Sequence, residues 1–322
     1  MNKHTLLSVQ GLKVDFKLRE KIFTAVDGIS FDLDRGQRLG LVGESGAGKS
    51  VTGFGIINLI SKPGFVSGGA VLFEGRDLTK LGPEEIRQIR GNRISMIFQD
   101  PMMTLNPVLT VGTQMIETLL AHKNISKKEA EAIALEKLRK VAIPSPEKRL
   151  SQYPHEFSGG MRQRIVIAIA LLTSPSLIIA DEPTTALDVT IQADIMELLL
   201  ELCESENMAL ILITHDLAVV SQVAERVAVM YAGNIVELAS TKDIGVRPQH
   251  PYTKGLLAAL PQNVSRRERL NQIPGSMPSI TSKSVGCAFH KRCSYAEDIC
   301  KTTVPPLELK ASGASVACHL VK

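Results

Sequence analysis

Eight residues that follow the strand-like sequence RLGLV have the composition of a phosphate-binding loop. They form the pattern G-x-x-x-x-G-K-S, and a helical stretch, VTGFGIINLI, comes directly after them. Glycines in such a loop let backbone N–H groups surround phosphate oxygens, the lysine neutralises the β and γ phosphates, and the serine hydroxyl can ligate Mg²⁺. A glycine-rich turn without a ligand is the alternative, which the complete pattern in this context disfavours. The residues are Gly43, Glu44, Ser45, Gly46, Ala47, Gly48, Lys49 and Ser50.

A pair of carboxylates follows a second apolar run, LIIA. Asp181 and Glu182 stand where a doubly wound sheet places its ligands, at the carboxyl end of a strand. Asp181 is suited to hold the Mg²⁺ shell, and Glu182 to polarise a water that attacks the γ-phosphate. Taken alone, the pair could be only the polar end of a strand, but its combination with a phosphate loop favours hydrolysis.

A second segment of small residues opens another helical stretch. Ser158, Gly159 and Gly160 precede MRQRIVIAIALL, so they form a second candidate anion grip at a helix N-terminus. A single nucleotide already occupies the phosphate loop, and we therefore expect this second anion-binding segment to contact ATP bound to another subunit. The alternative is a tight turn whose glycines allow close packing. The first interpretation predicts a dimer.

Two single polar residues end further apolar runs. Gln99 follows RISMIF and His215 follows ALILIT, so both are expected at the same rim of the sheet. Gln99 is placed to touch Mg²⁺ or water, and His215 to contact the γ-phosphate. Each could instead be an ordinary structural side chain.

The elements that must position these residues alternate between short apolar runs and longer helical patterns. Alternation of this kind predicts an α/β sheet covered by helices. The strand-like runs are Arg38 to Val42, Ile94 to Phe98, Leu177 to Ala180 and Ala209 to Ile213.

Between these strands, residues 101–174 are mainly helical in pattern. They include a capping box, Ser126 to Glu129, and we interpret the stretch as an inserted helical subdomain. Around Pro248 to Gly286 the composition changes to Pro, Ser and Arg, with PQNVSRRERLNQIPGSMPSI as a linker, which indicates a boundary near residue 240. We therefore expect a first domain over 1–240 and a C-terminal extension over 241–322.

Composition excludes several classes of protein. The 37 basic and 33 acidic residues among 322 give a net charge of +4, a mixed surface unlike that of a dedicated nucleic-acid binder. Aromatic residues make up 4% and there is no Trp, so stacking platforms for single strands are poorly supplied. The sequence shows neither a signal-like start nor an apolar run of the roughly 18 residues that a spanning helix needs. We expect a cytoplasmic protein that, if membrane-associated, is peripheral.

Taken together in their order along the chain, these segments resemble the nucleotide-binding subunits of ABC transporters over residues 6 to 240. GESGAGKS resembles the Walker A loop, FSGGM the signature motif and LIIADE the Walker B strand. Gln99 matches the Q-loop residue, His215 the switch histidine, and Ala186-Leu187-Asp188 the D-loop. The signature departs from LSGGQ at Phe157 and Met161. The resemblance implies an ABC-type P-loop α/β fold in which two subunits sandwich two ATP molecules.

The aromatic residue that stacks on adenine in this family has two candidates here. Phe16, in KVDF, is the first choice, and Phe23 is its rival because the register of the intervening LREKIF is uncertain. Either would add an apolar contact to the nucleotide base.

A narrower resemblance is to the ATPase subunits of bacterial dipeptide, oligopeptide and nickel importers. It is carried by VGESGAGKS, MIFQDPMMTLNP, PHEFSGGMRQR, DEPTTALDVTIQA and HPYTKGLLAALP. The resemblance implies a second ATPase chain, identical or different, two transmembrane permease subunits and an extracytoplasmic solute-binding protein. It also implies a peripheral position on the cytoplasmic face of the inner membrane, with QDPMMTLNP contacting the permease. No nucleic-acid partner is expected.

Four of the five cysteines lie in the last 36 residues, at Cys287, Cys293, Cys300 and Cys318. Four thiolates are a full ligand set for Zn²⁺ or an iron–sulfur cluster, whereas disulfides are improbable in a cytoplasmic protein. GCAFHKRC resembles the C-terminal motif of peptide-importer ATPases, some of which carry a 4Fe-4S cluster, and this favours the cluster over zinc. Four free thiols are the alternative, and His290 and His319 are possible substitute ligands.

We therefore expect an importer ATPase that couples ATP hydrolysis to uptake of peptides or similar small solutes. A soluble ABC ATPase acting on nucleic acid or ribosomes is the alternative, but the chain shows neither a long coiled-coil insertion nor tandem cassettes. A redox protein with incidental nucleotide binding fits less well, because the set of hydrolysis residues is complete. The cargo, which could be dipeptide, oligopeptide, nickel, glutathione or antimicrobial peptide, cannot be deduced from this chain.

Overall fold

The computed structural model describes residues 4–185, 187–260, 272–282 and 285–321. The chain forms two compact units: unit 1 comprises Met1–Lys80 and Leu212–Lys322, and unit 2 comprises Leu81–Ile211. The boundary falls within strand β8 (Ala209–Thr214). In the described ranges, no helix combines the length and the apolar character that crossing a membrane requires.

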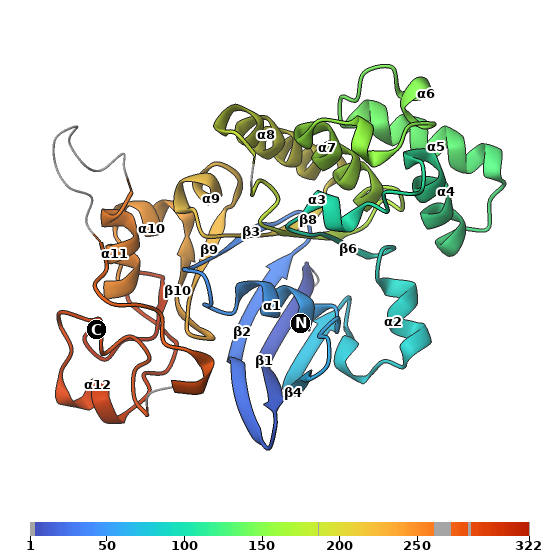
Figure 1. The fold of residues 1–322 in the computed structure, drawn as a ribbon. Coiled ribbons are helices and arrows are strands. Elements are labelled where there is room, and N and C mark those ends of the chain that lie inside the picture. Colours follow the sequence, from blue (N-terminus) through green and yellow to red (C-terminus); the bar gives the residue numbers. More distant parts are fainter. Residues whose placement is uncertain (1–3, 186, 261–271, 283–284, 322) are drawn as a thin grey trace. The chain divides into compact units, whose positions relative to one another are not determined.

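Unit 1 contains an antiparallel sheet in the order β2-β1-β4-β5, whose first three strands lie side by side in Figure 1. In the FDLD segment of β2, Phe31 and Leu33 are buried while the two aspartates between and after them are exposed. This alternation gives the sheet one buried face. The strands are β1 (Thr5–Leu18), β2 (Lys21–Asp34), β4 (Gly64–Phe73) and β5 (Arg76–Asp77).

Within a second sheet, unit 1 contributes neighbouring strands in the order β11-β12-β10-β9-β3. β3 and β9 pair in parallel, and β9, β10, β12 and β11 continue in antiparallel pairs. The last two strands come from the end of the chain, so the C-terminal extension adds to the edge of this sheet. The strands are β3 (Arg38–Val42), β9 (Arg226–Tyr231), β10 (Asn234–Ser240), β11 (Glu308–Leu309) and β12 (Ser315–Val316).

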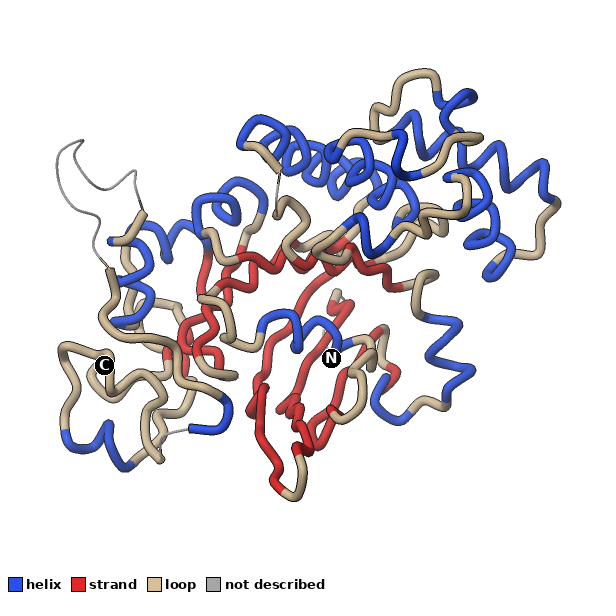
Figure 2. The backbone as a smooth tube through the Cα atoms, viewed as in Figure 1, coloured by secondary structure: helices blue, strands red, loops and turns tan. Residues whose placement is uncertain are grey.

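Short helices complete unit 1, and several begin at a side chain that caps them. Asp216, Ser240 and His250 accept hydrogen bonds from backbone N–H groups at the starts of α9, α10 and α11. Figure 2 shows that the chain after α11 is mostly loop. The helices are α1 (Lys49–Ile56), η1 (Leu78–Lys80), α9 (Leu217–Val223), α10 (Thr241–Val246), α11 (Pro251–Ala258), η4 (Ile280–Ser282) and α12 (Asp298–Thr302). Of the linker expected over 261–280, residues 261–271 lie outside the described residues.

Unit 2 contains the parallel pair β6 (Ile94–Ile97) and β7 (Leu177–Asp181) and a series of helices. The predicted capping box is confirmed, because Ser126 Oγ accepts from Glu129 N at 3.2 Å and Glu129 Oε2 accepts from Ser126 N at 2.8 Å. The helices are α2 (Pro83–Ile89), α3 (Pro101–Thr104), α4 (Val111–His122), α5 (Lys127–Lys140), α6 (Pro146–Arg149), η2 (Pro154–Glu156), α7 (Gly159–Ala170) and α8 (Val189–Glu206).

All four predicted strands are present, as β3, β6, β7 and β8. Their apolar side chains are buried, except that Met96 of β6 is half-buried, as expected for strands of a sheet that helices cover. Cys203, the cysteine outside the C-terminal group, is buried in α8. The sequence pattern therefore located the strands that carry the candidate site.

Candidate functional site

The phosphate loop connects β3 to α1 in a conformation that requires glycine. Gly46 and Gly48 have φ angles of 82° and 100°, a region that side chains other than glycine rarely adopt. A Cβ on Gly43 would lie 2.3 Å from the carbonyl oxygen of Met230, which leaves no room for any other residue. The loop is thus shaped both by its own glycines and by the adjacent backbone of unit 1.

Lys49, the first residue of α1, turns back into this loop. Its side chain is almost fully buried, and Nζ donates to the carbonyl oxygens of Gly43 at 2.8 Å and Glu44 at 3.1 Å. When a nucleotide binds, its phosphate oxygens can replace these carbonyls as acceptors for the ammonium. The geometry fits the predicted neutralisation of nucleotide phosphates.

The two aromatic candidates for an adenine contact are direct neighbours in the sheet of unit 1. Phe16 of β1 pairs with Phe23 of β2 in the antiparallel register, so their side chains emerge on the same face. Both are half-buried. Phe16 also packs closely on β4, because a Cβ on Gly64 would lie 2.7 Å from its ring. The register that the sequence left uncertain thus places both rings together.

The structure brings two predicted residues of unit 2 into contact. Asp181 is buried at the end of β7, and the next residue, Glu182, has a φ of 45° that turns the chain sharply. Glu182 Oε2 accepts hydrogen bonds from Gln99 Nε2 at 3.3 Å and from Thr185 Oγ1 at 2.8 Å. A strained backbone and two donors hold this carboxylate in a defined orientation, which is a requirement for a general base. The sequence did not identify Thr185 as a candidate site residue.

The signature segment begins the 12-residue helix α7. Ser158 caps it by accepting from Met161 N at 3.3 Å, while Ser158 and Gly159 are exposed. Gly160 has a packing role, because a Cβ there would lie 2.8 Å from Ile191 of α8. Phe157, which departs from the family pattern, is buried, so it fills the apolar position that leucine usually occupies.

The remaining predicted residues lie at element ends. Asp188 of the D-loop segment caps α8 by accepting from Ile191 N at 3.0 Å, whereas Ala186 lies outside the described residues. His215 follows β8 in unit 1 and is exposed. Unit 1 therefore carries the phosphate loop, the aromatic pair and His215, and unit 2 carries Gln99, the two carboxylates and the signature segment.

The four C-terminal cysteines occupy one region of unit 1. The pKa of the Cys287 thiol is raised by burial and by its neighbours Cys300, Cys318 and Cys293, and that of Cys293 is raised by burial and by Cys318 and Cys300. Within the described ranges, however, no three His, Cys, Asp or Glu side chains come together as a metal-binding group. The predicted cluster or zinc site is therefore not assembled in this structure.

The two histidines considered as substitute ligands make other contacts. Nδ1 of His290 lies 2.8 Å from the carbonyl oxygen of Cys287, and Nε2 of His319 lies 2.9 Å from that of Thr303. Each ring is therefore oriented by the backbone. These contacts do not add a ligand to the cysteine region.

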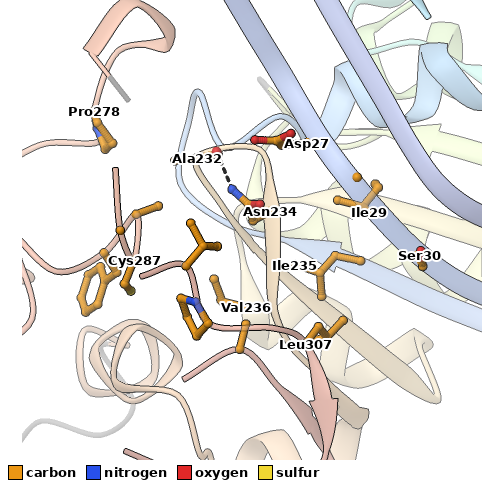
Figure 3. Close-up of a pocket in the computed structure, with 17 residues that line it drawn as sticks. Asp27, Ile29, Ser30, Ala232, Asn234, Ile235, Val236, Pro278, Cys287 and Leu307 are labelled. Carbon is orange, nitrogen blue, oxygen red and sulfur yellow. Dashed lines mark hydrogen bonds between the residues drawn. The ribbon is translucent and has the colours of Figure 1, made fainter. Parts of the chain in front are cut away.

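A pocket of about 430 Å³ in unit 1 lies between β2, β10 and the C-terminal extension (Figure 3). Its lining includes Asp27, Asn234 and Leu307. Of the predicted site residues, only Cys287 lines it. This pocket is therefore distinct from the phosphate loop.

Two residues that the sequence analysis missed contact the phosphate loop. Arg292 forms an ion pair with the Glu44 carboxylate, and the hydroxyl of Tyr252 accepts a hydrogen bond from Glu44 N. Tyr252 lies in HPYTKGLLAALP, a stretch that had been noted only as a resemblance. Arg292 lies in GCAFHKRC, which had been noted only for its cysteines and its resemblance.

Comparison with known proteins covers nearly the whole chain. The ABC transporter family model matches residues 26–185, and the model of the oligopeptide/dipeptide transporter C-terminal region matches 236–300. The chain is 51% identical over 316 residues to the dipeptide transport ATP-binding protein DppD of Bacillus subtilis, covering 98% of this chain and 94% of that protein. It is 48% identical over 317 residues to the oligopeptide transport ATP-binding protein AppD of the same organism, covering 98% and 97%.

A solved structure shares the fold of about three quarters of the chain. The dimeric ATP-binding cassette MJ0796, bound to ADP and Pi, is 27% identical with a TM-score of 0.66. The match covers 73% of this chain and 98% of that one. The remainder of this chain has no counterpart in that cassette.

Proposed function

Because this chain belongs to the family of ATP-binding subunits of dipeptide and oligopeptide ABC importers, we propose that it hydrolyses ATP to drive peptide uptake through partner membrane subunits. The observation that carries this function is the phosphate loop, in which Lys49 is buried against the loop carbonyls at the start of α1. The hydrolysis residues that the family requires are all present in the sequence.

Each residue has a distinct role in hydrolysis. Lys49 and the loop N–H groups bind the β and γ phosphates, and the glycine conformations keep those groups pointed inward. Glu182 accepts the proton of the attacking water, and its bond from Gln99 keeps the carboxylate oriented. His215 contacts the γ-phosphate. Phe16 stacks on adenine, with Phe23 beside it.

The chain also offers suitable groups for Mg²⁺. Ser50 at the start of α1, the buried carboxylate of Asp181 and the amide oxygen of Gln99 are hard oxygen donors, which Mg²⁺ prefers. When bound, Mg²⁺ neutralises charge that develops on the phosphates. The donor chemistry of this set therefore fits the ion.

A second ATPase subunit completes each site in our proposal. Ser158 and Gly159 are exposed, which leaves them available to a nucleotide on a partner chain. Val189, next to the D-loop segment, is 84% exposed, as expected of an apolar residue that a partner covers. The likeness to a dimeric cassette supports this arrangement. The partner can be a second copy or a different ATPase chain.

The permease contact is assigned to the segment after Gln99. Met102, Met103 and Val108 are exposed there, Met103 by 85%. Adjacent exposed apolar side chains on one segment suit a protein interface. We propose that this surface contacts one of two transmembrane permease subunits, to which an extracytoplasmic binding protein delivers the solute. The chain then has a peripheral position on the cytoplasmic face of the membrane.

We retain the domain organisation inferred from the sequence as part of the proposal. It comprises a nucleotide-binding domain over 1–240, a helical subdomain over 101–174 and the extension over 241–322. The helices α3 to α7 support the second of these. The match of a separate C-terminal family model to 236–300 supports the third.

A 4Fe-4S cluster, or alternatively Zn²⁺, remains a separate proposal for the four cysteines. The neighbouring thiols that help to raise the pKa of Cys287 and of Cys293 support it, because they place the four cysteines in one region. The described arrangement does not fit a ligand set, and we assign no step of hydrolysis to such a group. Iron, sulfide and zinc analysis of the purified protein tests this proposal, and absence of all three would leave four free thiols.

The function is tested with Glu182→Gln. The variant should bind MgATP like the unchanged protein, while turnover falls about a hundredfold or more because the general base is lost. Glu201→Gln, an exposed carboxylate of α8, is the matched control. Full hydrolysis by Glu182→Gln would contradict the assignment.

Partners and transport need a second measurement. Permease subunits should co-purify with the chain from membranes, and a strain with Glu182→Gln should fail to take up peptide. Co-purification with ribosomes or DNA in place of permeases would favour the nucleic-acid alternative.

A further inference from the structure

The C-terminal part of unit 1 contacts the phosphate loop at several points. Two guanidinium nitrogens of Arg292 donate to the two oxygens of the Glu44 carboxylate, at 2.8 and 3.1 Å. The Tyr252 hydroxyl accepts from Glu44 N at 2.9 Å. Met277 lies 3.9 Å from the position that a Cβ on Gly46 would occupy. Both the side chain and the backbone of Glu44 are therefore held by residues of the C-terminal part of unit 1.

Arg292 is itself held in place on several sides. Its Nε donates to the carbonyl oxygen of Pro274 at 2.9 Å, and one terminal nitrogen also reaches that of Ile273 at 3.3 Å. The guanidinium carbon lies 5.8 Å from the centre of the Tyr231 ring. Only 7% of the Arg292 side chain is exposed, against 29% for Glu44. A buried, bidentate pair with a fixed arginine defines the position of its carboxylate.

Tyr252 is equally fixed. Its side chain is fully buried, and its ring packs edge-on against Tyr231 at 4.7 Å and tilted against Phe289 at 5.4 Å between ring centres. Burial raises the pKa of Tyr252, so the phenol stays protonated. Its oxygen therefore stays a neutral acceptor for the Glu44 N–H.

The charge of Glu44 gives these contacts a functional meaning. A carboxylate in a loop that binds triphosphate would repel the ligand. The ion pair with Arg292 neutralises this charge and turns the carboxylate toward the extension. Polar groups of the loop backbone are thereby fixed before the nucleotide arrives, which lowers the ordering cost of binding.

We propose that Arg292 and Tyr252 are positioning residues of the phosphate loop, so that ATP affinity depends on the C-terminal extension. This inference rests on the proposed function. Arg292 lies in the segment between Cys287 and Cys293, and Tyr252 lies on α11. The extension is thus part of the nucleotide site rather than an appendage to it.

A charge cycle on the full-length chain tests the proposal by equilibrium binding of MgATP. Arg292→Gln should weaken binding about tenfold, because it leaves a carboxylate unpaired beside the phosphates. The double variant Glu44→Gln with Arg292→Gln should return to within about threefold of the unchanged chain, because both charges are gone. Tyr252→Phe, which removes only the acceptor oxygen, should weaken binding about threefold. Arg247→Gln, which breaks an exposed ion pair with Asp243, is the control and should bind normally.

The outcomes separate this inference from the function itself. Recovery in the double variant supports a charge effect, because a merely structural loss would not be reversed by removing Glu44. Unchanged binding by Arg292→Gln, or a double variant as weak as the single one, would overturn the proposal. If Arg292→Gln fails to fold, Arg292→Lys keeps the charge but loses the bidentate geometry and should bind less tightly than the unchanged chain. Failure of the unchanged chain to bind MgATP would instead refute the proposed function.

Discussion

His250 gives the stability of the extension a defined dependence on pH. The ring is buried, and its Nδ1 accepts from Tyr252 N at 3.0 Å to cap α11, which only an unprotonated Nδ1 can do. Burial and the nearby Lys254 lower the pKa of His250 from 6.5 to about 4. Because the folded pKa lies below the unfolded one, the unfolded chain takes up the proton first as the pH falls. The stabilisation is complete above 6.5 and is lost progressively toward 4.

The size of the effect follows from these two values. Linkage gives a loss of about 2 kcal/mol in the free energy of unfolding between pH 7.5 and pH 5 from this group alone. His250→Asn retains a capping oxygen but cannot titrate. Between pH 7.5 and pH 5, its free energy of unfolding should therefore fall by about 2 kcal/mol less than that of the unchanged chain. Subtracting the two profiles removes the contribution of every other titrating group.

Tyrosine fluorescence during urea unfolding is the suitable assay. The chain has no Trp, and of its four tyrosines Tyr231, Tyr252 and Tyr295 lie in unit 1. His155→Asn, at an exposed position, is the control and should follow the unchanged chain. Parallel profiles for the unchanged chain and His250→Asn between pH 7.5 and pH 5 would refute the reasoning.

Three further results are expected. Gly43→Ala should abolish MgATP binding because its Cβ would meet the Met230 carbonyl oxygen, whereas Gly245→Ala, which meets open space, should bind normally in the same titration. Glu237→Ala should lower the free energy of unfolding by about 2 to 4 kcal/mol, because this buried carboxylate accepts hydrogen bonds from Gln249 N and His250 N. A loss below about 0.5 kcal/mol, measured by urea unfolding, would contradict this prediction. Burial alone would raise the pKa of Glu206, but hydrogen bonds and charge from Lys140 and Lys137 lower it overall. The ionised carboxylate therefore stabilises the fold, and acid unfolding below about pH 4.5 should begin at a lower pH in the unchanged chain than in Glu206→Gln. Coincident acid midpoints for the two proteins would contradict this prediction.

In the C-terminal extension, the sequence pattern and the folded structure point to different residues. Its cysteine spacing attracted attention in the sequence, yet in the described structure the thiols share a region without forming a ligand set. The residue beside Cys293, Arg292, lies in GCAFHKRC, but nothing in that motif indicates a contact with the phosphate loop. Its partner is 248 positions earlier in the chain, and no local pattern encodes a pairing over that separation.

The sequence by itself determined the strands, the phosphate loop and the candidate catalytic residues at strand ends. These depend on local regularities: apolar runs of strand length, glycines where φ must be positive, and polar residues that directly follow a strand. The capping box at Ser126 and the position of Glu182 after β7 are of this kind.

Only the tertiary structure decided which residues meet. It paired Phe16 with Phe23 across two strands, brought Gln99 to Glu182, and set Arg292 against Glu44. Such contacts depend on the packing of distant segments, and many partners satisfy the same local sequence equally well. The physical reason is that the sequence gives the type of each side chain directly. Its neighbours in space, in contrast, depend on the free energy of the whole folded chain.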